Sequence, residues 1–219
     1  MKRALVLVEG PTEEQFVNAV LQPHLWARSS TWITPTILNT KVVKSGPNFK
    51  GGVLSYSQVK RDIDKLLQDQ DAAFVTTLLD YYGLPTSFPG LATRPNGTAR
   101  QRVDHVQQAF GRSIDHDRFV PFLALHEFEA WLFCDLGERT AWVYQGGDLD
   151  ALRQVRQSVA SPEEINEGYT TAPSRRVSAA FPGYQKPFHG PLATMEMGVE
   201  AIRQQCPHFN EWLTRLEAF

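Results

Sequence analysis

The sequence predicts an α/β fold in which a mostly parallel β-sheet is flanked by helices, with a helical C-terminal extension. Three observations support this class. Short apolar runs rich in β-branched residues alternate with segments of helical periodicity. Acidic residues follow directly where several of these runs end. Beyond residue 135 the signals are helical and interrupted. We therefore expect an α/β domain over residues 1–135 and a helical extension over 136–219 packed on it.

Four apolar runs are predicted to be strands, covering residues 4–8, 32–38, 72–79 and 119–125. The first helix is predicted to begin at Thr12, where Thr12 and Gln15 have the spacing of a capping box, and to bend or end near Pro23. The glycine-rich segment 44–53 is predicted to be a mobile loop. Further helices are predicted over 59–67, 98–110 and 149–159, followed by two more that end at Leu216.

The composition is that of an ordinary soluble protein with a real core, at 219 residues, 42% apolar and 21% charged. A net charge of −2 argues against binding nucleic acid by bulk charge, so a polyanion would have to meet a local basic patch. No apolar run approaches membrane-spanning length. Cys134 and Cys206 form no CxxC pair, which predicts neither a disulfide framework nor a zinc site. We expect a cytoplasmic protein.

Carboxylates follow three of the predicted strands at the point where each strand ends. Glu9 follows the first strand, Asp80 the third, and Glu127 and Glu129 the fourth. Because ligands gather at the carboxyl ends of parallel strands, these acids are predicted to converge at one edge of the sheet. Hard oxygen ligands without a Cys or His set favour Mg²⁺ or Mn²⁺ over zinc. The predicted metal ligands are Glu9, Asp80, Glu127 and Glu129.

Each acid also has a purely structural interpretation. Asp80 is a potential turn former ahead of Gly83 and Pro85, and Glu13 fits equally well as a helix N-terminal acid facing the dipole or as a catalytic residue. Glu127 and Glu129 share a face only if the strand continues, so the sequence does not decide which of them is a ligand. The candidate catalytic residues are Glu9, Glu13, Asp80, Glu127 and Glu129.

The segment Leu-Val-Glu-Gly-Pro-Thr-Glu at residues 7–13, followed by the strand-end Asp80, resembles the Toprim domain of topoisomerases, primases and OLD-type nucleases. The whole chain resembles still more a bacterial group of Toprim-like proteins of unknown function. Segments shared with that group are residues 80–85, 126–130, 172–176, 184–186 and 206–209.

The resemblance implies a Rossmann-like Toprim fold with a metal-dependent site. In it Glu9 is a ligand or general acid/base, and Asp80 is the first acid of an Asp-x-Asp signature. The chain departs from that signature because Tyr82 stands in the place of the second acid. Glu127 or Glu129 would then supply the missing carboxylate. The resemblance also implies an ABC-type or AAA-type ATPase partner in anti-phage defence.

Basic residues are candidates for contacts to substrate phosphates. Arg175, Arg176 and Lys186 lie near Tyr184 in the sequence, and arginine forks beside an aromatic ring suit phosphates and unstacked bases. His126 is a candidate phosphate contact or proton carrier, although a hydrogen-bonded structural histidine is the common alternative. Short basic groups are also typical of solvated faces. Further candidates with weaker support are Lys41, Lys44 and Lys50 in the glycine-rich segment, and Arg94, Arg100 and Arg102.

Three functions are consistent with these patterns. The first is a Mg²⁺-dependent endonuclease that acts as the toxic effector of a defence system, cleaving DNA or RNA. The second is a catalytically degenerate Toprim module that binds an ATPase or a phage protein. The third is a phosphohydrolase acting on small phosphoesters, which requires a closed pocket. The sequence leaves the polymer, the number of metal ions and a homodimer open.

Overall fold

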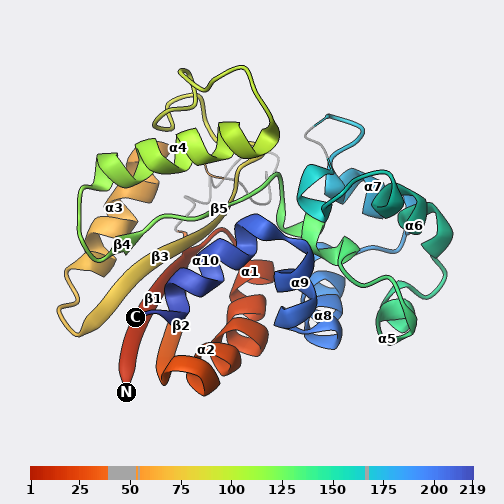
Figure 1. The fold of residues 1–219 in the computed structure, drawn as a ribbon, viewed down its shortest axis with the longest axis horizontal. Coiled ribbons are helices and arrows are strands. Elements are labelled where there is room, and N and C mark those ends of the chain that lie inside the picture. Colours follow the sequence, from red (N-terminus) through yellow and green to blue (C-terminus); the bar gives the residue numbers. More distant parts are fainter. Residues whose placement is uncertain (39–52, 54, 166–167) are drawn as a thin grey trace, which may run out of the picture.

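The computed structural model describes residues 1–38, 53, 55–165 and 168–219 of the chain. Its centre is a parallel sheet with the strand order β2-β1-β3-β4, and β5 pairs with the end of β3 (Figure 1). This confirms the predicted α/β class with a parallel sheet. The strands are β1 (Lys2–Val8), β2 (Thr31–Ile37), β3 (Ala72–Asp80), β4 (Phe119–Val120) and β5 (Leu123–Ala124).

Alternate residues of the strands serve two separate cores, one on each face of the sheet. In β1, Ala4, Val6 and Val8 belong to one core, and Leu5 and Leu7 to the other. Figure 1 shows helices on both faces of the sheet, so every central strand is covered on both sides, as its continuous apolar sequence predicts.

The helix after β1 begins one residue earlier than predicted and is capped differently. It consists of α1 (Pro11–Phe16), a π-helical turn (Val17–Leu21) and α2 (Gln22–Ser29). The capping box predicted at Thr12 is wrong, because Gly10 is the N-cap residue and no side chain caps the helix. Pro23 lies in the first turn of α2, directly after the π-helical turn, where a missing N–H disrupts little.

The other face of the sheet is covered by α3 (Tyr56–Leu67) and α4 (Ala99–Ile114), which confirms the two helices predicted there. A complete capping box formed by Thr98 and Gln101 begins α4. The predicted loop 44–53, with Lys41, Lys44 and Lys50, lies outside the described residues except for Val53.

The strand predicted over 119–125 is broken into the two short strands β4 and β5. Phe119 and Val120 pair with the middle of β3, and Leu123 and Ala124 pair with its end. Thr77 in β3 donates its hydroxyl hydrogen to the Phe122 carbonyl oxygen and accepts from the Phe122 N–H. The Thr77 side chain therefore replaces the backbone bonds between β3 and the segment that links β4 to β5. The periodicity of the sequence does not predict this break.

The C-terminal region is helical, as predicted, but contains more helices than expected. Trp212 reaches the sheet and donates its indole N–H to Thr76 in β3, so this region shares a core with one sheet face. The predicted boundary at residue 135 stays a prediction. The helices are a 3-10 helix (Phe128–Phe133), α5 (Glu138–Ala141), a 3-10 turn (Trp142–Tyr144), α6 (Leu149–Gln157), a 3-10 turn (Pro162–Glu164), α7 (Pro173–Ala180), α8 (Lys186–Met197), α9 (Val199–Gln205) and α10 (Pro207–Glu217).

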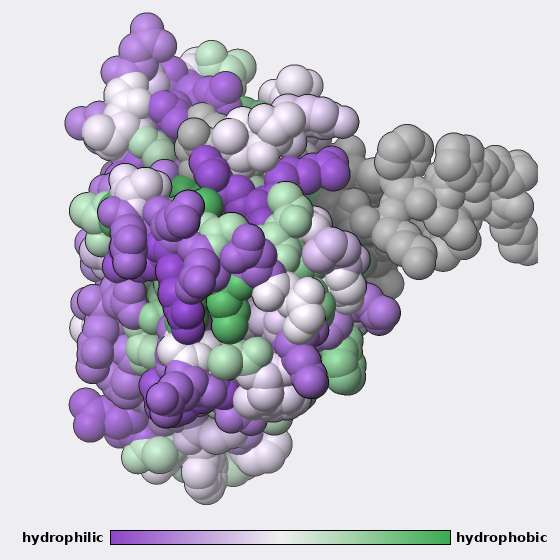
Figure 2. Space-filling view, turned by 90° about the vertical axis from the view of Figure 1, so that its right-hand side faces the viewer, coloured by the Kyte–Doolittle hydropathy of each residue, from purple (hydrophilic) through white to green (hydrophobic). Residues whose placement is uncertain are grey.

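The outer face of this region is mostly hydrophilic where its atoms are described, with apolar residues in small separate groups (Figure 2). None of the helices that the structure describes combines the length and the apolar character needed to cross a membrane. Cys134 and Cys206 are buried free cysteines whose sulfur atoms lie 3.4 Å apart.

Candidate functional site

Glu9 and Asp80 lie side by side at the carboxyl edge of the sheet. After β1 the chain crosses to β2 on one side and later returns to β3 on the other, so a topological switch point lies between β1 and β3. This crevice is where open parallel sheets bind ligands. Glu9 follows β1, Asp80 ends β3, and the Asp80 N–H donates to Glu9 Oε2 at 3.2 Å. The predicted convergence of these two acids is confirmed.

Glu13 joins them from the first turn of α1. Its side chain is only 3% exposed, although it belongs to a helix that starts at the surface. Burial of an acid at this position exceeds what a favourable interaction with the helix dipole requires. The helix dipole alone therefore does not account for the placement of Glu13, and its catalytic role stays a prediction.

The segment after β5 brings a fourth carboxylate to the same place. The Tyr82 N–H donates to the His126 carbonyl oxygen at 2.8 Å, which extends the pairing beyond the strands. His126 has a left-handed backbone with φ of 68°, which turns the chain into the 3-10 helix. Asp80 Oδ1 then accepts from the Phe128 N–H at 2.8 Å. Glu129, in the first turn of that helix, is fully buried.

Lys186, the first residue of α8, lies among these acids. Its ammonium nitrogen is 3.1 Å from Glu129 Oε2, 3.4 Å from Asp80 Oδ2 and 3.6 Å from Glu13 Oε1. Residues from α1, β3, the 3-10 helix and α8 thus share one centre. We call Glu9, Glu13, Asp80 and Glu129 the carboxylate cluster. Tyr184 donates to the cluster through its hydroxyl, 3.3 Å from Glu129 Oε1.

A cavity of about 960 Å³ opens onto the cluster. Its size suits a ligand much larger than an ion. The side chain of Tyr82, which stands in place of a second acid of the signature, lies on its wall and is 37% exposed. Other residues that line the cavity are Glu9, Pro11, Thr12, Glu13, Asp80, Gly83, Glu127, Gln185, Lys186 and Pro187.

Burial raises the pKa values of the three glutamates in the cluster. Burial, with the nearby charges of Asp80 and Glu13, raises the pKa of Glu9 to about 8. Burial chiefly raises the pKa of Glu129 to about 7 and also raises the pKa of Glu13, while Lys186 acts in the opposite direction on both. The surrounding carboxylates raise the pKa of Lys186 well above its usual value despite its burial. The carboxylate charges therefore favour the charged form of Lys186, and burial favours the neutral forms of Glu9, Glu13 and Glu129.

The structure separates the roles of Glu127 and Glu129, which the sequence left open. Glu127 Oε2 accepts from the Ser174 N–H at 2.9 Å and Glu127 Oε1 accepts from the Ser174 hydroxyl at 3.0 Å. Both of its oxygens therefore bind the first turn of α7, although Glu127 also lines the cavity. Glu129 instead contacts Lys186 together with Asp80 and Glu13. The geometry favours Glu129 as the fourth acid of the centre and Glu127 as the residue that holds α7.

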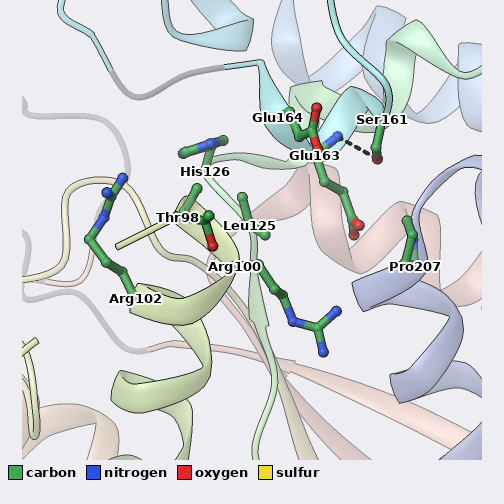
Figure 3. Close-up of a pocket in the computed structure, with 10 residues that line it drawn as sticks. Thr98, Arg100, Arg102, Leu125, His126, Ser161, Glu163, Glu164 and Pro207 are labelled. Atoms are coloured by element: carbon green, nitrogen blue, oxygen red, sulfur yellow. Dashed lines mark hydrogen bonds between the residues drawn. The ribbon is translucent and has the colours of Figure 1, made fainter. Parts of the chain in front are cut away.

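His126 lines a second cavity of about 480 Å³, whose other lining residues include none of the carboxylate cluster (Figure 3). Arg100 and Arg102 from the first turn of α4 line the same cavity. Arg100 is engaged with Asp104 and Glu211, whose carboxylates it contacts at 2.8 Å and 2.5 Å. Since the His126 ring lies in a separate cavity, a direct role at the cluster is not supported by its position.

The predicted substrate-binding residues do not gather at one place. Lys186 lies in the cluster. Arg175 is exposed, with its guanidinium 5.4 Å from the centre of the Tyr169 ring. Arg176 donates to the Thr171 carbonyl oxygen and lines a third cavity of about 310 Å³ between α6 and α7. A guanidinium beside an exposed aromatic ring is still suited to nucleic acid, so the prediction for Arg175 stays open to test.

The donor set fits a hard divalent cation. Glu13 Oε1 and Glu129 Oε2 are buried oxygens that lie 3.6 Å and 3.1 Å from the ammonium nitrogen of Lys186. Carboxylate oxygens are the ligands that Mg²⁺ and Mn²⁺ prefer. Within the described residues, no group of three or more His, Cys, Asp or Glu side chains is already arranged to hold a metal ion. Lys186 occupies the shared centre instead.

Sequence reasoning missed two residues that shape this site. Ser174 lies in the shared segment 172–176 but was not a candidate site residue, and it holds Glu127. Tyr184 was noted only as an aromatic neighbour, but its hydroxyl donates to Glu129. Both act across more than 45 residues of chain. The sequence does place Tyr184 and Lys186 together in the shared segment 184–186. It does not show where either side chain points.

Gly190 allows α8 to approach closely enough for Lys186 to reach the cluster. A Cβ atom at this position would lie 3.2 Å from the Thr12 methyl carbon and 3.3 Å from the Phe128 ring, and both neighbours are buried. We expect Gly190→Ala to reduce the free energy of unfolding by about 1 kcal/mol, because overpacking of about 1–3 kcal/mol outweighs a helix-propensity gain of about 1 kcal/mol. Urea denaturation measures this change.

The matched control for this prediction is Met195→Ala on the exposed side of α8, where Met195 is 51% exposed. It should change the free energy of unfolding by less than about 0.5 kcal/mol. A Gly190→Ala variant as stable as the wild type would show that α8 has room to shift.

The chain belongs to the family described as a domain of unknown function (DUF4276), whose model matches residues 8–217. The match begins with the last residue of β1 and ends in α10, so it includes the whole carboxylate cluster and Lys186. No curated protein matches the chain significantly. No solved structure matches it significantly either.

Proposed function

We propose that this member of the DUF4276 family is a Mg²⁺- or Mn²⁺-dependent nuclease of the Toprim kind that cleaves nucleic-acid phosphodiesters. The observation that carries the proposal is the carboxylate cluster. Acids that follow β1, begin α1, end β3 and lie in the 3-10 helix meet at the switch point of a parallel sheet, and Glu9, Glu13 and Asp80 border a cavity of about 960 Å³. Burying several acids together is costly, and a divalent cation offsets that cost.

Glu9, Asp80 and Glu129 would hold the metal, with Glu13 beside them. When bound, Mg²⁺ would polarise the phosphodiester and favour ionisation of a bound water molecule. Glu9 accepts the Asp80 N–H at Oε2, which leaves Oε1 as the oxygen that would bind the metal. Asp80 is oriented by the Phe128 N–H, so its second oxygen faces the centre.

The direct test is to incubate the purified chain with DNA and RNA polymers in Mg²⁺ or Mn²⁺ and to follow cleavage on denaturing gels. Cleavage that requires the metal and is abolished by chelation is the expected result. Persistent absence of cleavage of both polymers, with a partner ATPase included, would refute the proposal. Turnover of a generic small phosphodiester without polymer cleavage would instead support a phosphohydrolase acting on small phosphoesters.

The resemblance to Toprim effectors extends the proposal to a biological role. The nuclease would be the toxic effector of an anti-phage system, held in check or released by an ABC-type or AAA-type ATPase. Co-purification of the tagged chain with an ATPase encoded beside it tests this part. Cleavage by the isolated chain at full rate, unchanged by that ATPase, would argue against such control.

A second candidate is a catalytically degenerate module that binds an ATPase or a phage protein. The observations that favour it are Tyr82 at the place of the second acid and Lys186 within ion-pair distance of three acids. Calorimetric titration with Mg²⁺ and Mn²⁺ separates the two functions. Absence of binding heat at millimolar metal would favour the interaction module, whereas saturable binding would favour the nuclease.

A further inference from the structure

Lys186 contacts the three acids at distances that leave no room for a metal ion at the same centre. Its nitrogen lies 3.1–3.6 Å from oxygens of Glu129, Asp80 and Glu13. An Mg²⁺ ion bound by the same oxygens would need them at about 2.0–2.1 Å, in octahedral geometry. Two cations in one low-dielectric centre repel each other strongly. Lys186 and a bound divalent cation therefore exclude each other from this position.

The lysine side chain is able to leave without moving its helix. Lys186 is the first residue of α8, its side chain is 37% exposed, and it borders the cavity of about 960 Å³. The helix itself is held by the close packing of Gly190 on Thr12 and Phe128. Rotation of the flexible four-carbon stem is therefore the smallest movement that frees the centre.

The carboxylates need a cation beside them in both the metal-free and the metal-bound protein. Negative charge predominates, because four acids surround a single ammonium group, and all four act to raise the pKa of Lys186. Without any cation, the carboxylates of the buried Asp80 and Glu129 would lie close together with no positive charge to offset the cost of burying them.

We propose that Lys186 is a built-in substitute for the divalent cation: it holds the carboxylate cluster together in the metal-free protein, and metal binding displaces it into the adjoining cavity. The inference rests on the proposed function, since it concerns the metal of the same site. In the metal-bound state the displaced ammonium lies where a substrate phosphate would enter, so one side chain both opposes metal binding and meets the substrate. The site thereby requires a threshold concentration of metal before it is assembled.

The test is calorimetric titration of the chelator-treated full chain with MnCl₂, comparing the wild type with Lys186→Met, which keeps the length of the stem and removes the charge. We expect Lys186→Met to bind Mn²⁺ roughly 10-fold more tightly, because the metal no longer competes with an ammonium group. The metal-free variant should melt at a lower temperature than the wild type, and Mn²⁺ should raise its melting temperature by more.

The control is Lys60→Met on α3, which removes a lysine whose ammonium is 3.2 Å from Asp64, away from the cluster. It should leave the Mn²⁺ affinity unchanged. Lys186→Arg keeps a cation at the cluster and guards against misfolding of the methionine variant. It should bind Mn²⁺ no more tightly than the wild type.

The outcomes are distinguishable. Mn²⁺ affinity that is equal or weaker in a folded Lys186→Met variant, with clear binding by the wild type, would overturn the displacement and leave the metal-dependent function standing. Tighter binding by Lys186→Arg than by the wild type would also overturn it. Failure of both the wild type and Lys186→Met to bind Mn²⁺ would reject the metal site itself, and the inference with it.

Discussion

Asp80→Asn is expected to lower the rate of metal-dependent cleavage by roughly 10³-fold or more while the fold persists. The two carboxylate oxygens of Asp80 make different contacts. Its Oδ1 accepts from the Phe128 N–H, and its Oδ2 lies 3.4 Å from the cationic centre. Asparagine keeps an oxygen for the Phe128 N–H but removes the negative charge that a metal ligand needs. The measurement is the initial cleavage rate at saturating Mn²⁺.

Asp71→Asn provides the matched control, since Asp71 is exposed and precedes the start of β3, whereas Asp80 ends the strand. This variant should cleave at the wild-type rate. Circular dichroism establishes whether both variants are folded. If Asp80→Asn retained full activity, Asp80 would not belong to the catalytic centre, whatever the activity of the protein.

The metal-free protein is expected to lose stability as the pH rises from about 5 to about 9. Glu9 has a folded-state pKa of about 8 and Glu129 one of about 7, both above the ordinary value of 4.5. Between the ordinary pKa of 4.5 and these raised values, the folded state binds more protons than the unfolded chain. The free energy of unfolding therefore falls as the pH rises. The stabilisation that these groups contribute is complete below about pH 4.5 and lost above their folded pKa values. Thermal melting in chelator at several pH values measures it.

Glu129→Gln should raise the melting temperature of the metal-free protein at about pH 9, by roughly 5 °C, and flatten its pH dependence. The fully buried Glu129 carboxylate is costly when ionised, and glutamine keeps the acceptor for the Tyr184 hydroxyl without the charge. The same variant should lose metal-dependent cleavage, because a neutral amide is a poor ligand for Mg²⁺. Stability and activity would then change in opposite directions, as expected for a site built at the expense of stability.

Glu164→Gln is the control for this pair of measurements, because Glu164 lies outside the cluster and lines the other cavity. Its melting temperature should follow the same pH dependence as the wild type. A Glu129→Gln variant that melts lower than the wild type at about pH 9 would show that the ion pair with Lys186 outweighs the burial cost of the carboxylate.

The sequence alone determined the strands and the place of the acids along them. The apolar runs of β1 and β3 each end at or beside an acid, Glu9 or Asp80, and a parallel sheet necessarily brings such ends to one edge. Local signals were less reliable where a side chain from elsewhere decided the outcome. The Thr77 side chain in β3 bonds the backbone of Phe122, in the segment that links β4 to β5.

Only the tertiary structure decided which acids share a centre and what lies among them. Glu127 and Glu129 are two residues apart, yet Ser174 binds one and Lys186 contacts the other. Those partners lie more than 45 residues further along the chain, on α7 and α8. Periodicity shows which face of its own helix or strand a residue occupies. Charge pairing depends on how separate helices and strands pack against one another. For this reason the carboxylates were predictable from the sequence, and the position of Lys186 among them was not.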